Sequence, residues 1–383
     1  MAQASLQRIA PGSAEEAAEA LREASEAGRR VRLRGGGTKL GWGNVTPPAD
    51  VELSTERLDA ILEHNEGDLT AIVQAGLPLA RAQEAFARAG QMLPLDPPLG
   101  DGAATVGGVV ATADSGPLRH RHHALRDLVL GVRVALPDGT VARAGSKVIK
   151  NVAGYDLGKL MSGAYGTLGL VAEVSLRLHP LPLGTATAVG RGADPALLAA
   201  VAASLAHQPL EAEALDVAWA GEEGAVLARF GGASARERAR ETAAALADSA
   251  LDAEVVDDDA ALWERQRAAQ RSPGGVVLRV STTQRGVAAA LVAARDISAR
   301  VVGRAALGIV WITLPEASAQ AVAALRAALA PARCVVLDAP PAVREALDPW
   351  GEEDPARVAL MRRVKERFDP RGVCNPGLMV GGI

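Results

Sequence analysis

Residues 30–39 read RVRLRGGGTK, a short alternating segment that runs directly into three glycines. Apolar residues that alternate with arginines predict a strand over 30–34. Consecutive glycines let successive backbone N–H groups point into one concavity that suits phosphate oxygens, and Thr38 and Lys39 add a hydroxyl and a cation. The common G-x-G-x-x-G and Walker motifs do not fit, because Leu40 replaces a required glycine and no G-K-[ST] occurs. Taken alone, such a segment is more often an ordinary strand-to-loop turn.

Two further glycine-rich segments follow, each next to a predicted strand. The first is TVGG at 105–108, followed by small residues as far as Gly116. The second is NVAGYDL at 151–157, which leads into GTLGLV at 166–171. Missing side chains let a flat ring or a pyrophosphate lie against the main chain. The alternatives are a tight loop between packed elements for the first segment and a helix-to-strand turn for the second.

Together, and in this order, the segments resemble the FAD-binding domain of the vanillyl-alcohol-oxidase superfamily, also called PCMH-type. The stretches that carry the resemblance are RGGGT at 34–38, TVGG at 105–108, KNVAGYDLGKL at 150–160 and GTLG at 166–169. FDP at 368–370 and NPG at 375–377 resemble the C-terminal signature. Within the superfamily the chain resembles the FAD-binding (E) subunits of bacterial glycolate oxidases. The resemblance is specific over 28–182, moderate from about 355, and only positional in between.

The resemblance implies FAD as the cofactor and assigns residues to it. Residues 35–38 match the loop whose amides hold the pyrophosphate, residues 105–116 match the segment along the isoalloxazine and diphosphate, and residues 169–171 match a strand start on the adenosine side. Amide nests neutralise a diphosphate without a metal, so the residue types agree with this assignment, and no metal site is predicted. The cofactor-binding residues are Gly35, Gly36, Gly37, Thr38, Lys39, Thr105, Gly107, Gly108, Ser115, Gly116, Gly169, Leu170 and Val171. Valine at Gly36 and Gly107 is expected to leave a folded chain without flavin.

Some relatives attach the flavin covalently through a histidine at the position of Thr38. The threonine here predicts FAD that is bound non-covalently. His120, His122 and His123 lie in a later loop beside two arginines. This cluster is predicted to be a solvated basic loop rather than an attachment site.

The implied fold is α+β. A two-part PCMH-type FAD-binding domain is expected over 1–182, a smaller cap domain with an antiparallel sheet covered by helices over 183–345, and a C-terminal helix and tail that pack back on the FAD domain over 346–383. The residues support the first boundary, because Pro180, Pro182 and Gly184 end a strand predicted over 170–179.

Local signals place the elements. Ser13 and Glu16 form a capping-box pattern that starts a helix running to Gly28, and Pro137-Asp138-Gly139 predicts a hairpin. A final helix is predicted from Asp354-Pro355. In the cap, strands are predicted over 213–219, 224–230, 275–281, 307–314 and 333–338, and helices over 194–206, 233–249, 284–298 and 317–329. Their order suggests an imperfect duplication.

Composition excludes several classes of protein. The 383 residues carry 41 Lys+Arg against 45 Asp+Glu, a net charge of -4, so no basic excess supports binding to nucleic acid. No stretch reaches the roughly 20 apolar residues of a membrane-spanning helix, and the first residues lack a secretory signal pattern. Cys334 and Cys374 are the only cysteines, too few for a four-cysteine iron–sulfur cluster. A cytoplasmic protein is expected, which reaches the inner face of the membrane through partners.

The resemblance implies the FAD-binding subunit of a glycolate oxidase complex, with a larger homologous FAD subunit and an iron–sulfur subunit as partners. Oxidation of a 2-hydroxy acid usually needs a histidine base and Arg or Lys anchors. The second domain holds one histidine, His207, and no clustered histidine–carboxylate motif. We therefore expect flavin-dependent oxidation of glycolate or a similar 2-hydroxy acid to the 2-oxo acid to occur in the complex, with electrons passing to the iron–sulfur partner, and we assign no catalytic residue here.

Two alternatives stay open. One is a self-sufficient FAD-dependent D-lactate or glycolate dehydrogenase, in which Arg279, Arg304 or Lys150 binds the carboxylate and Tyr155 or a loop histidine handles the proton. The other is a non-catalytic scaffold subunit without flavin, which the intact glycine segments oppose.

Two further sets of charged residues are functional candidates. Lys147 or Lys150 is a hypothetical cation near the flavin, although surface lysines are commoner. Asp257-Asp258-Asp259 is predicted to be a loop and helix N-cap rather than a metal site.

Overall fold

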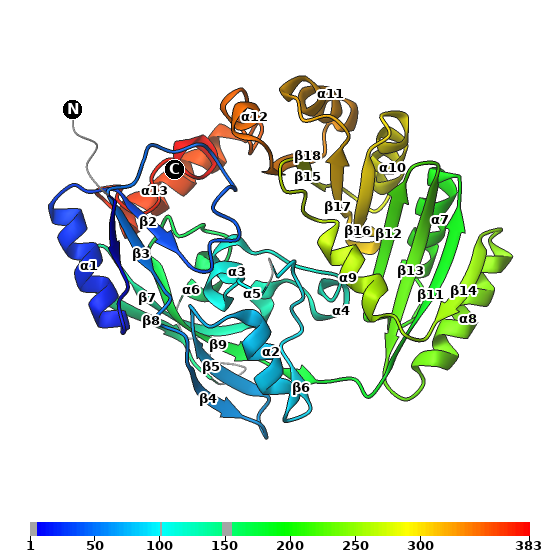
Figure 1. Ribbon diagram of the computed structural model, residues 1–383, viewed down its shortest axis with the longest axis horizontal. Coiled ribbons are helices and arrows are strands. Elements are labelled where there is room, and N and C mark those ends of the chain that lie inside the picture. The colour runs from blue at the N-terminus through cyan, green and yellow to red at the C-terminus, as the bar shows by residue number, and fades with distance from the viewer. Residues whose placement is uncertain (1–5, 100–101, 148–154) are drawn as a thin grey trace.

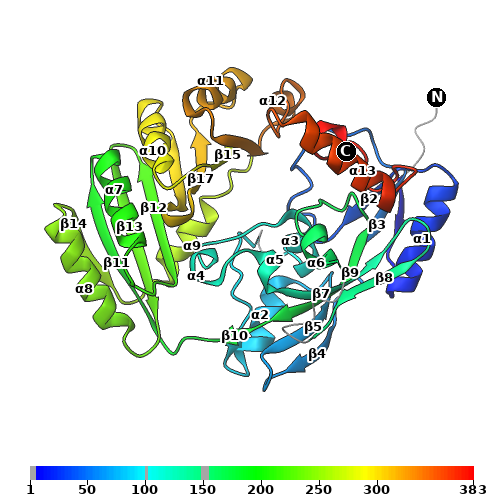
Figure 2. The same cartoon turned by 180° about the vertical axis from the view of Figure 1, so that it is seen from behind.

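The computed structural model describes residues 6–99, 102–147 and 155–383, which form two lobes lying side by side (Figure 1). The first lobe contains the chain up to residue 180 together with residues 350–383, and the second lobe contains residues 185–338. Figure 2 shows the chain leaving the first lobe after β10 (His179–Pro180). It returns through α12 (Pro341–Glu345) and α13 (Pro355–Phe368). The fold is α+β, as predicted.

The first lobe is built on two sheets. The smaller sheet is parallel, in the order β1 (Gln7–Ile9), β3 (Val51–Ser54), β2 (Val31–Arg34). The larger sheet is antiparallel, in the order β4 (Ile61–Asn65), β5 (Thr70–Gln74), β9 (Leu170–Arg177), β7 (Val129–Ala135), β8 (Val141–Gly145). A short pair, β6 (Gln91–Met92) with β10, extends towards the second lobe. The β7–β8 hairpin turns at the predicted Pro137–Gly139 segment.

One helix, α1 (Ala14–Glu26), holds the two sheets together. It starts where the capping pattern predicts, because the Ser13 side chain accepts a hydrogen bond from the Glu16 amide. Its buried alanines and Leu21 share a core with Leu53 of the small sheet and Leu170 of the large sheet. Four further helices of this lobe pack around the larger sheet; they are α2 (Leu79–Ala87), α3 (Val106–Thr112), α5 (Leu125–Leu128) and α6 (Leu157–Met161).

The second lobe is a duplication. Its first copy is β11 (Thr185–Gly192), α7 (Pro195–Ala206), β12 (Ala214–Ala220), β13 (Glu223–Gly231), α8 (Ala235–Asp248), β14 (Asp252–Val256). Its second copy is β15 (Val276–Ser281), α10 (Gly286–Asp296), β16 (Arg300–Arg304), β17 (Ile309–Leu314), α11 (Ala319–Leu329), β18 (Arg333–Asp338). Each copy has the same internal strand order, and β12 pairs with β16 to give the eight-stranded sheet β14-β11-β13-β12-β16-β17-β15-β18. The helix α9 (Ala260–Ala268) links the copies.

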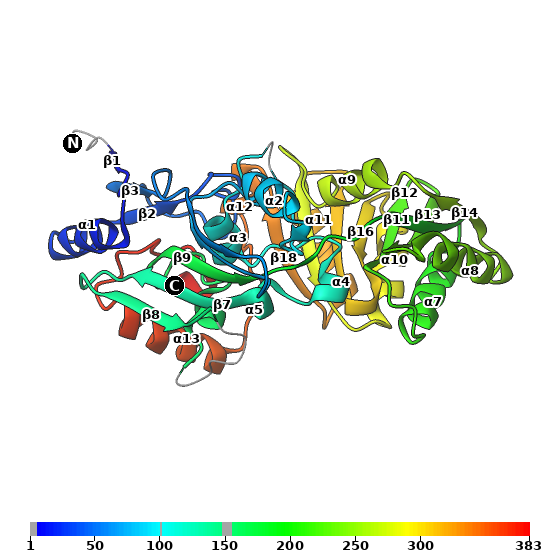
Figure 3. The same ribbon diagram turned by 90° about the horizontal axis from the view of Figure 1, so that it is seen from below.

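Strand alternation decides what each face of this sheet contacts. On β15, Val276, Leu278 and Val280 pack with the helices α7, α10 and α11. Val277 points to the opposite face and packs with Trp42 and the C-terminal residues of the first lobe. The side view in Figure 3 shows the sheet standing between the first lobe and α8. Arg279 has the same parity as Val277 and therefore lies on the face that meets the first lobe.

The predicted strands and helices of this lobe are present with small shifts at their ends, and three strands were missed: β11, β14 and β16. The helix α9 was predicted only through its N-cap at 257–259, without a range. The strand predicted over 307–314 begins at Ile309, because a short 3-10 turn (Ala305–Leu307) ends at Gly308 with a φ of +63°. Among the described residues, no helix is long and apolar enough to cross a membrane.

The C-terminal helix α13 packs on the first lobe through one apolar stripe of Val358, Met361, Val364 and Phe368. After it, the chain runs to a second 3-10 turn (Val380–Gly382). Buried Lys365 anchors this segment: its Nζ donates to the Thr167 carbonyl at 2.6 Å, the Asp369 carboxylate at 2.6 Å and the Cys374 carbonyl at 2.8 Å. The Asp369 carboxylate also accepts the Cys374 amide at 2.7 Å.

We expect Lys365→Met to lower the free energy of unfolding by about 3–5 kcal/mol, because it leaves the Asp369 charge buried without its partner. Urea denaturation followed by circular dichroism measures this change. Lys159→Met is the matched control, since the Lys159–Asp156 pair is exposed and its loss should change the free energy of unfolding by less than about 1 kcal/mol. Equal effects of the two substitutions would contradict the anchoring role of Lys365.

Candidate flavin-binding site

A cavity of about 1440 Å³, counting the part that opens to solvent, lies in the first lobe. Four segments that are far apart in the sequence line it: the end of β2 with the loop 35–42, residues 104–112 around α3, residues 164–171 before and within β9, and the tail 375–378. The parallel sheet and the larger sheet therefore each supply part of its wall.

The structure brings most of the predicted cofactor residues together around this cavity. Those that line it are Gly35, Gly36, Gly37, Thr38, Lys39, Thr105, Gly107, Gly108, Gly169, Leu170 and Val171. Ser115 and Gly116 are not among the lining residues. They lie where the two lobes meet, and the Ser115 carbonyl accepts a hydrogen bond from Gln270 at 3.0 Å.

The loop after β2 offers unpaired donors. Among the described residues, the amides of Gly36, Gly37 and Thr38 have no hydrogen-bond acceptor, although all three residues line the cavity. Because most backbone N–H groups in folded proteins have an acceptor, three successive amides without one at a cavity wall are available to a ligand with several acceptor oxygens. A diphosphate has that chemistry, as the nest hypothesis requires.

The glycines of these loops are required mainly by chain packing. A Cβ at Gly36 would lie 1.5 Å from the Ala103 carbonyl oxygen, and one at Gly107 would lie 2.5 Å from the Ala75 Cβ. The expectation that valine at both positions would leave a folded chain is therefore wrong, because these side chains would collide with neighbouring chain. Gly108 differs: a Cβ there would meet only the Thr105 hydroxyl, at 3.1 Å.

Thr105 fixes the start of α3 against the loop before it. Its hydroxyl accepts the Gly108 amide at 3.2 Å, and the Gly107 amide donates to the Ala75 carbonyl at 2.7 Å. Thr105 is therefore an N-cap that holds the glycines at the cavity wall.

Lys39 does not stand free in the cavity as a phosphate-binding cation. Its Nζ lies 3.2 Å from the Asp114 carboxylate, and both side chains are almost fully buried. The ammonium also lies 5.6 Å from the centroid of the Trp42 ring. Beside it, burial raises the pKa of Tyr165 to about 12, so this cavity-lining hydroxyl stays protonated at neutral pH.

The second lobe contacts the glycine loop directly through Asp338. Its carboxylate accepts hydrogen bonds from the Trp42 indole at 3.0 Å, the Arg271 guanidinium at 2.8 Å and the Ser272 amide at 3.0 Å. Arg271 in turn donates to the Thr38 carbonyl at 3.2 Å. The position of the second lobe and the shape of the glycine loop are thus tied together.

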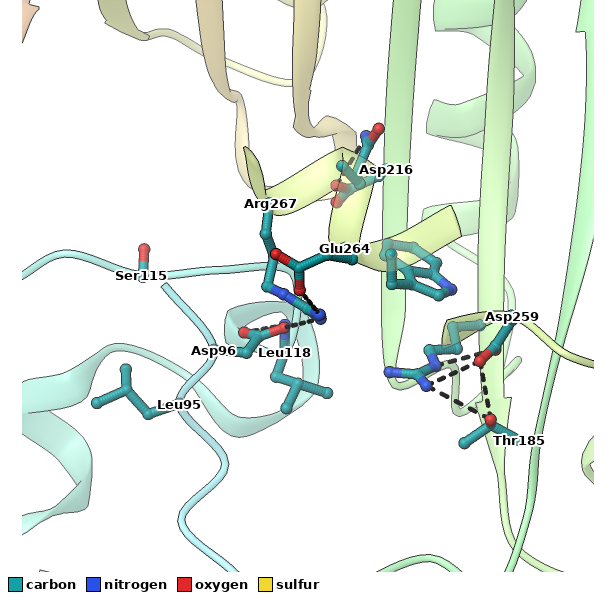
Figure 4. Close-up of polar contacts among 12 residues, drawn as sticks. Leu95, Asp96, Ser115, Leu118, Thr185, Asp216, Asp259, Glu264 and Arg267 are labelled. Atoms are coloured by element: carbon teal, nitrogen blue, oxygen red, sulfur yellow. Dashed lines mark hydrogen bonds and ion pairs between the residues drawn. The ribbon is translucent and has the colours of Figure 1, made fainter. Parts of the chain in front are cut away.

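A second polar contact between the lobes surrounds Asp96. Figure 4 shows Arg267 of α9 reaching towards this carboxylate, 3.8 Å away, while the Leu118 amide donates to it at 3.0 Å. Burial raises the pKa of Asp96 to about 6, with Arg304 and Arg267 opposing the shift. Asp216, which faces Arg304 across the β12–β16 junction, also has its pKa raised to about 6 by burial.

The histidine loop is not solvated, contrary to the prediction. His122, in the short helix α4 (Arg119–His122), has a side chain that is 8 % exposed and bonds to Glu213 of the second lobe at 3.0 Å. The His122 ring also packs against His179 at 4.6 Å. Burial lowers the pKa of His120, and His123 is exposed. The loop joins the lobes, and none of its histidines lines the cavity.

The residues proposed to bind the substrate carboxylate, to handle its proton or to place a cation near the flavin do not lie together in the cavity. Tyr155 is 94 % exposed and does not line the cavity, which contradicts a role for it as a base there. Lys147 bonds to Glu63 at 2.7 Å and is likewise absent from the cavity wall, and Lys150 lies outside the described residues. Arg304 is fully buried beside Asp216, whereas the Arg279 Nε is buried without a hydrogen-bond partner among the described residues.

The acidic run before α9 has a structural role. Asp259 occupies the N-cap position of α9, as predicted, but its buried carboxylate bonds to Arg229, Thr185 and Thr187. Figure 4 shows the Asp259 carboxylate bonded to Thr185. Within the described residues, no group of three or more His, Cys, Asp or Glu side chains is placed to hold a metal ion.

Sequence reasoning missed several residues of the cavity wall, among them Trp42, Ala111, Tyr165 and Asn375. Asn375 joins two walls of the cavity. Its side chain accepts a hydrogen bond from the Leu33 amide at 2.9 Å and donates one to the Tyr165 carbonyl at 2.7 Å. The NPG signature of the tail was the available signal for this residue.

Comparison with known proteins agrees with this geometry. Residues 6–145 match the family described as FAD binding domain, and residues 350–379 match the family described as FAD linked oxidases, C-terminal domain. Both the FAD-binding model and the C-terminal model of the FAD-linked oxidases thus match parts of this chain, in agreement with the resemblance seen in the sequence.

The relatives named for glycolate and D-lactate each match less than half of this chain, and the chain spans less than half of their length. The chain is 37 % identical to glycolate oxidase subunit GlcE of Escherichia coli K12 over 150 residues, 39 % of this chain and 42 % of that protein. It is 33 % identical to the mitochondrial D-lactate dehydrogenase [cytochrome] of Arabidopsis thaliana over 181 residues, 47 % of this chain and 31 % of that protein. An uncharacterized FAD-linked oxidoreductase of Mycobacterium tuberculosis is 29 % identical and aligns over 97 % of this chain and 90 % of its own.

A solved structure, alkyldihydroxyacetonephosphate synthase, shares the fold. It superposes with a TM-score of 0.69 at 14 % identity, covering 96 % of this chain and 76 % of that one. The two-lobe arrangement is therefore a known one for this fold.

We expect Gly108→Leu to weaken FAD binding at least tenfold, about 1.4 kcal/mol, because the new side chain has open space only on the cavity side. Fluorescence titration of the FAD-free protein measures the dissociation constant. Gly67→Leu is the control, since a Cβ there meets nothing within 4 Å and Gly67 does not line the cavity. FAD affinity that is unchanged in Gly108→Leu would place the cofactor elsewhere.

Proposed function

We propose that this chain, which carries the FAD binding domain and the C-terminal domain of the FAD-linked oxidases, binds FAD in the first-lobe cavity and takes part in oxidising a small 2-hydroxy acid such as glycolate or D-lactate. The observation that carries the proposal is the row of unpaired amides at Gly36, Gly37 and Thr38 in a cavity whose wall comes from three glycine-rich segments. The relatives named for glycolate and D-lactate supply the substrate class.

The cavity residues fit the cofactor by their chemistry. The amides of 36–38 and the Thr38 hydroxyl are donors for the diphosphate, and the open space at Gly108 leaves room for a ring against α3. When bound, FAD supplies the hydride acceptor. The main chain at Gly169, Leu170 and Val171 forms another part of the wall, to which we assign the adenosine side.

We infer that FAD is held non-covalently. Thr38 lines the cavity in place of a histidine, and no histidine belongs to the described residues that line it. The alternative attachment residues His120, His122 and His123 are engaged at the junction of the lobes or face solvent.

We further propose that the chain acts as the flavin-carrying subunit of a cytoplasmic complex, with a larger homologous FAD subunit and an iron–sulfur subunit as partners and peripheral membrane contact through them. The name of the Escherichia coli relative, a glycolate oxidase subunit, supports a subunit role. Cys334 and Cys374, the chain's two cysteines, are too few to ligate a four-cysteine iron–sulfur cluster, so such a cluster would be held by another chain.

A specific observation favours a second candidate, a self-sufficient dehydrogenase. Arg279 lies on the sheet face that meets the first lobe, and its Nε is buried without a hydrogen-bond partner among the described residues. Arg119, from the first lobe, is close enough that Arg279 and burial both lower its pKa, burial more strongly. Arg119 also donates to the Ser115 hydroxyl at 3.4 Å, whereas the free Nε of Arg279 is a donor that a substrate carboxylate could use. A scaffold without flavin remains the less favoured third reading, because it leaves the amides of 36–38 without a ligand.

We expect acid precipitation of the purified flavoprotein to release its yellow colour into the supernatant, because no covalent bond retains the cofactor. Absorbance of supernatant and pellet near 450 nm measures the partition. A yellow pellet would contradict non-covalent binding, and a colourless folded protein that refuses added FAD would establish the scaffold reading.

Anaerobic mixing with glycolate or D-lactate separates the two catalytic candidates. If the chain works as a subunit, the flavin of the isolated chain should stay oxidised, and that of the natively purified complex should bleach. Bleaching of the isolated chain that is lost in Arg279→Met and kept in the exposed control Arg285→Met would establish the self-sufficient dehydrogenase instead. Absence of bleaching in both preparations with these and related 2-hydroxy acids would reject the proposed substrate class.

A further inference from the structure

The buried ion pair of Lys39 and Asp114 joins two of the segments around the cavity. Lys39 follows the glycine loop, and Asp114 follows α3 by two residues. Their charged atoms lie 3.2 Å apart, with side chains 6 % and 3 % exposed. Lys39 belongs to the cavity wall, whereas Asp114 lies behind it. A buried ion pair therefore stands at the cavity wall, with the Lys39 ammonium turned to Asp114.

The pair is not completed as a structural ion pair would be. Asp114 uses one oxygen to accept the Ser115 amide at 2.9 Å, but its other oxygen, the one near Lys39, makes no hydrogen bond among the described residues. Burying two charges is expensive, and apolar residues of similar size often stabilise a fold as well or better. The ion pair therefore adds little net free energy to folding once the cost of burying both charges is counted. This points to an effect of the pair on the molecule that occupies the cavity.

Other cations near the cavity are differently placed. Arg30, Arg32 and Arg34 also line it, but their side chains are 36–44 % exposed and paired with Asp50 or Glu52, so solvent screens them. Arg271 stacks over Trp42 and is bound by Asp338. Among the described residues of the wall, Lys39 is the cation whose side chain is nearly buried.

We propose that Lys39 stabilises the negative charge that the flavin gains on reduction, and that Asp114 limits this effect by holding part of the Lys39 charge. The inference rests on the proposed binding of FAD. A hydride carries two electrons and one proton, so its transfer from the substrate carbon breaks a C–H bond, forms an N–H bond and leaves one negative charge on a previously uncharged ring. A buried cation facing that ring lowers the free energy of the reduced form.

The two residues make predictions of opposite sign. Lys39→Met removes the cation and should lower the reduction potential of the bound flavin. Asp114→Asn leaves the cation without its counter-charge and should raise the potential. A tenfold change in the ratio of affinities for oxidised and reduced FAD corresponds to about 30 mV for a two-electron couple, and we expect at least that change in each direction.

Equilibration with reference dyes measures the potential at saturating FAD, and a sulfite titration gives an independent readout. Sulfite bonds to the flavin through its sulfur lone pair and leaves negative charge on the ring, so its dissociation constant should rise at least tenfold in Lys39→Met and fall in Asp114→Asn. Lys39→Arg, which keeps the charge, should stay within threefold of the unmodified protein. Lys147→Met is the control, because Lys147 pairs with Glu63 away from the cavity.

Unchanged potentials, or shifts of the same sign in Lys39→Met and Asp114→Asn, would overturn this proposal while leaving FAD binding intact. Loss of FAD binding in Lys39→Met with retained thermal stability would also overturn it, by assigning Lys39 to holding the cofactor. If Lys39→Met does not fold, Lys39→Arg and Asp114→Asn carry the test, and a potential that Asp114→Asn does not raise rejects the proposal. Failure of the unmodified protein to bind FAD would instead reject the proposed function.

Discussion

The structure depends on the close approach of Gly36 to the carbonyl oxygen of Ala103. No side chain fits between them, since a Cβ at Gly36 would lie 1.5 Å from that oxygen, and at Gly35 a Cβ would lie 2.4 Å from the Thr105 hydroxyl. The loop after β2 is therefore pressed against the chain that leads into α3. Among the described residues, the amides of Gly36, Gly37 and Thr38 in this loop have no acceptor, and all three residues line the cavity. A packing constraint between two backbone segments thus produces the donor row on which cofactor binding rests.

The same loop is where the second lobe attaches. Asp338 holds Trp42 and Arg271, and Arg271 reaches the Thr38 carbonyl, so the docking contact ends on the residue whose amide faces the cavity. On the other side, Lys365 and Asn375 tie the C-terminal tail to the residues before β9 and to β2. The cavity wall is therefore held by contacts from the second lobe and from the C-terminal tail. Any ligand that orders the glycine loop also stabilises the docking of the second lobe, because the two share hydrogen-bond partners.

The sequence carried the fold of the first lobe and most of the cofactor residues, because glycine loops and strand ends are local signals. The missed elements β11 and β16 contain glycines and short apolar runs, TATAVGRG and RVVGR, whose strand character comes from pairing with neighbours. Ser115 and Gly116 lie outside the cavity wall, since Gly116 packs against the Asp96 carbonyl and not against a ligand. The His122–Glu213 contact and the Lys39–Asp114 pair each join residues far apart in the chain, so no local pattern could have shown them.

Glycines near a cofactor are commonly attributed to the approach of the ligand, and here that inference holds only in part. Gly36 and Gly107 lack a side chain because neighbouring protein atoms occupy the position of a Cβ. At Gly108 a Cβ would meet only the Thr105 hydroxyl. The distribution of charge follows a related logic. A diphosphate carries the same charge in both redox states, so neutral amides suffice to hold it, and a buried cation would act equally on both states. A ring that gains a charge on reduction is the one part of the cofactor where a buried cation changes the chemistry. The position of Lys39, past the amide row and backed by Asp114, is where such a cation is useful.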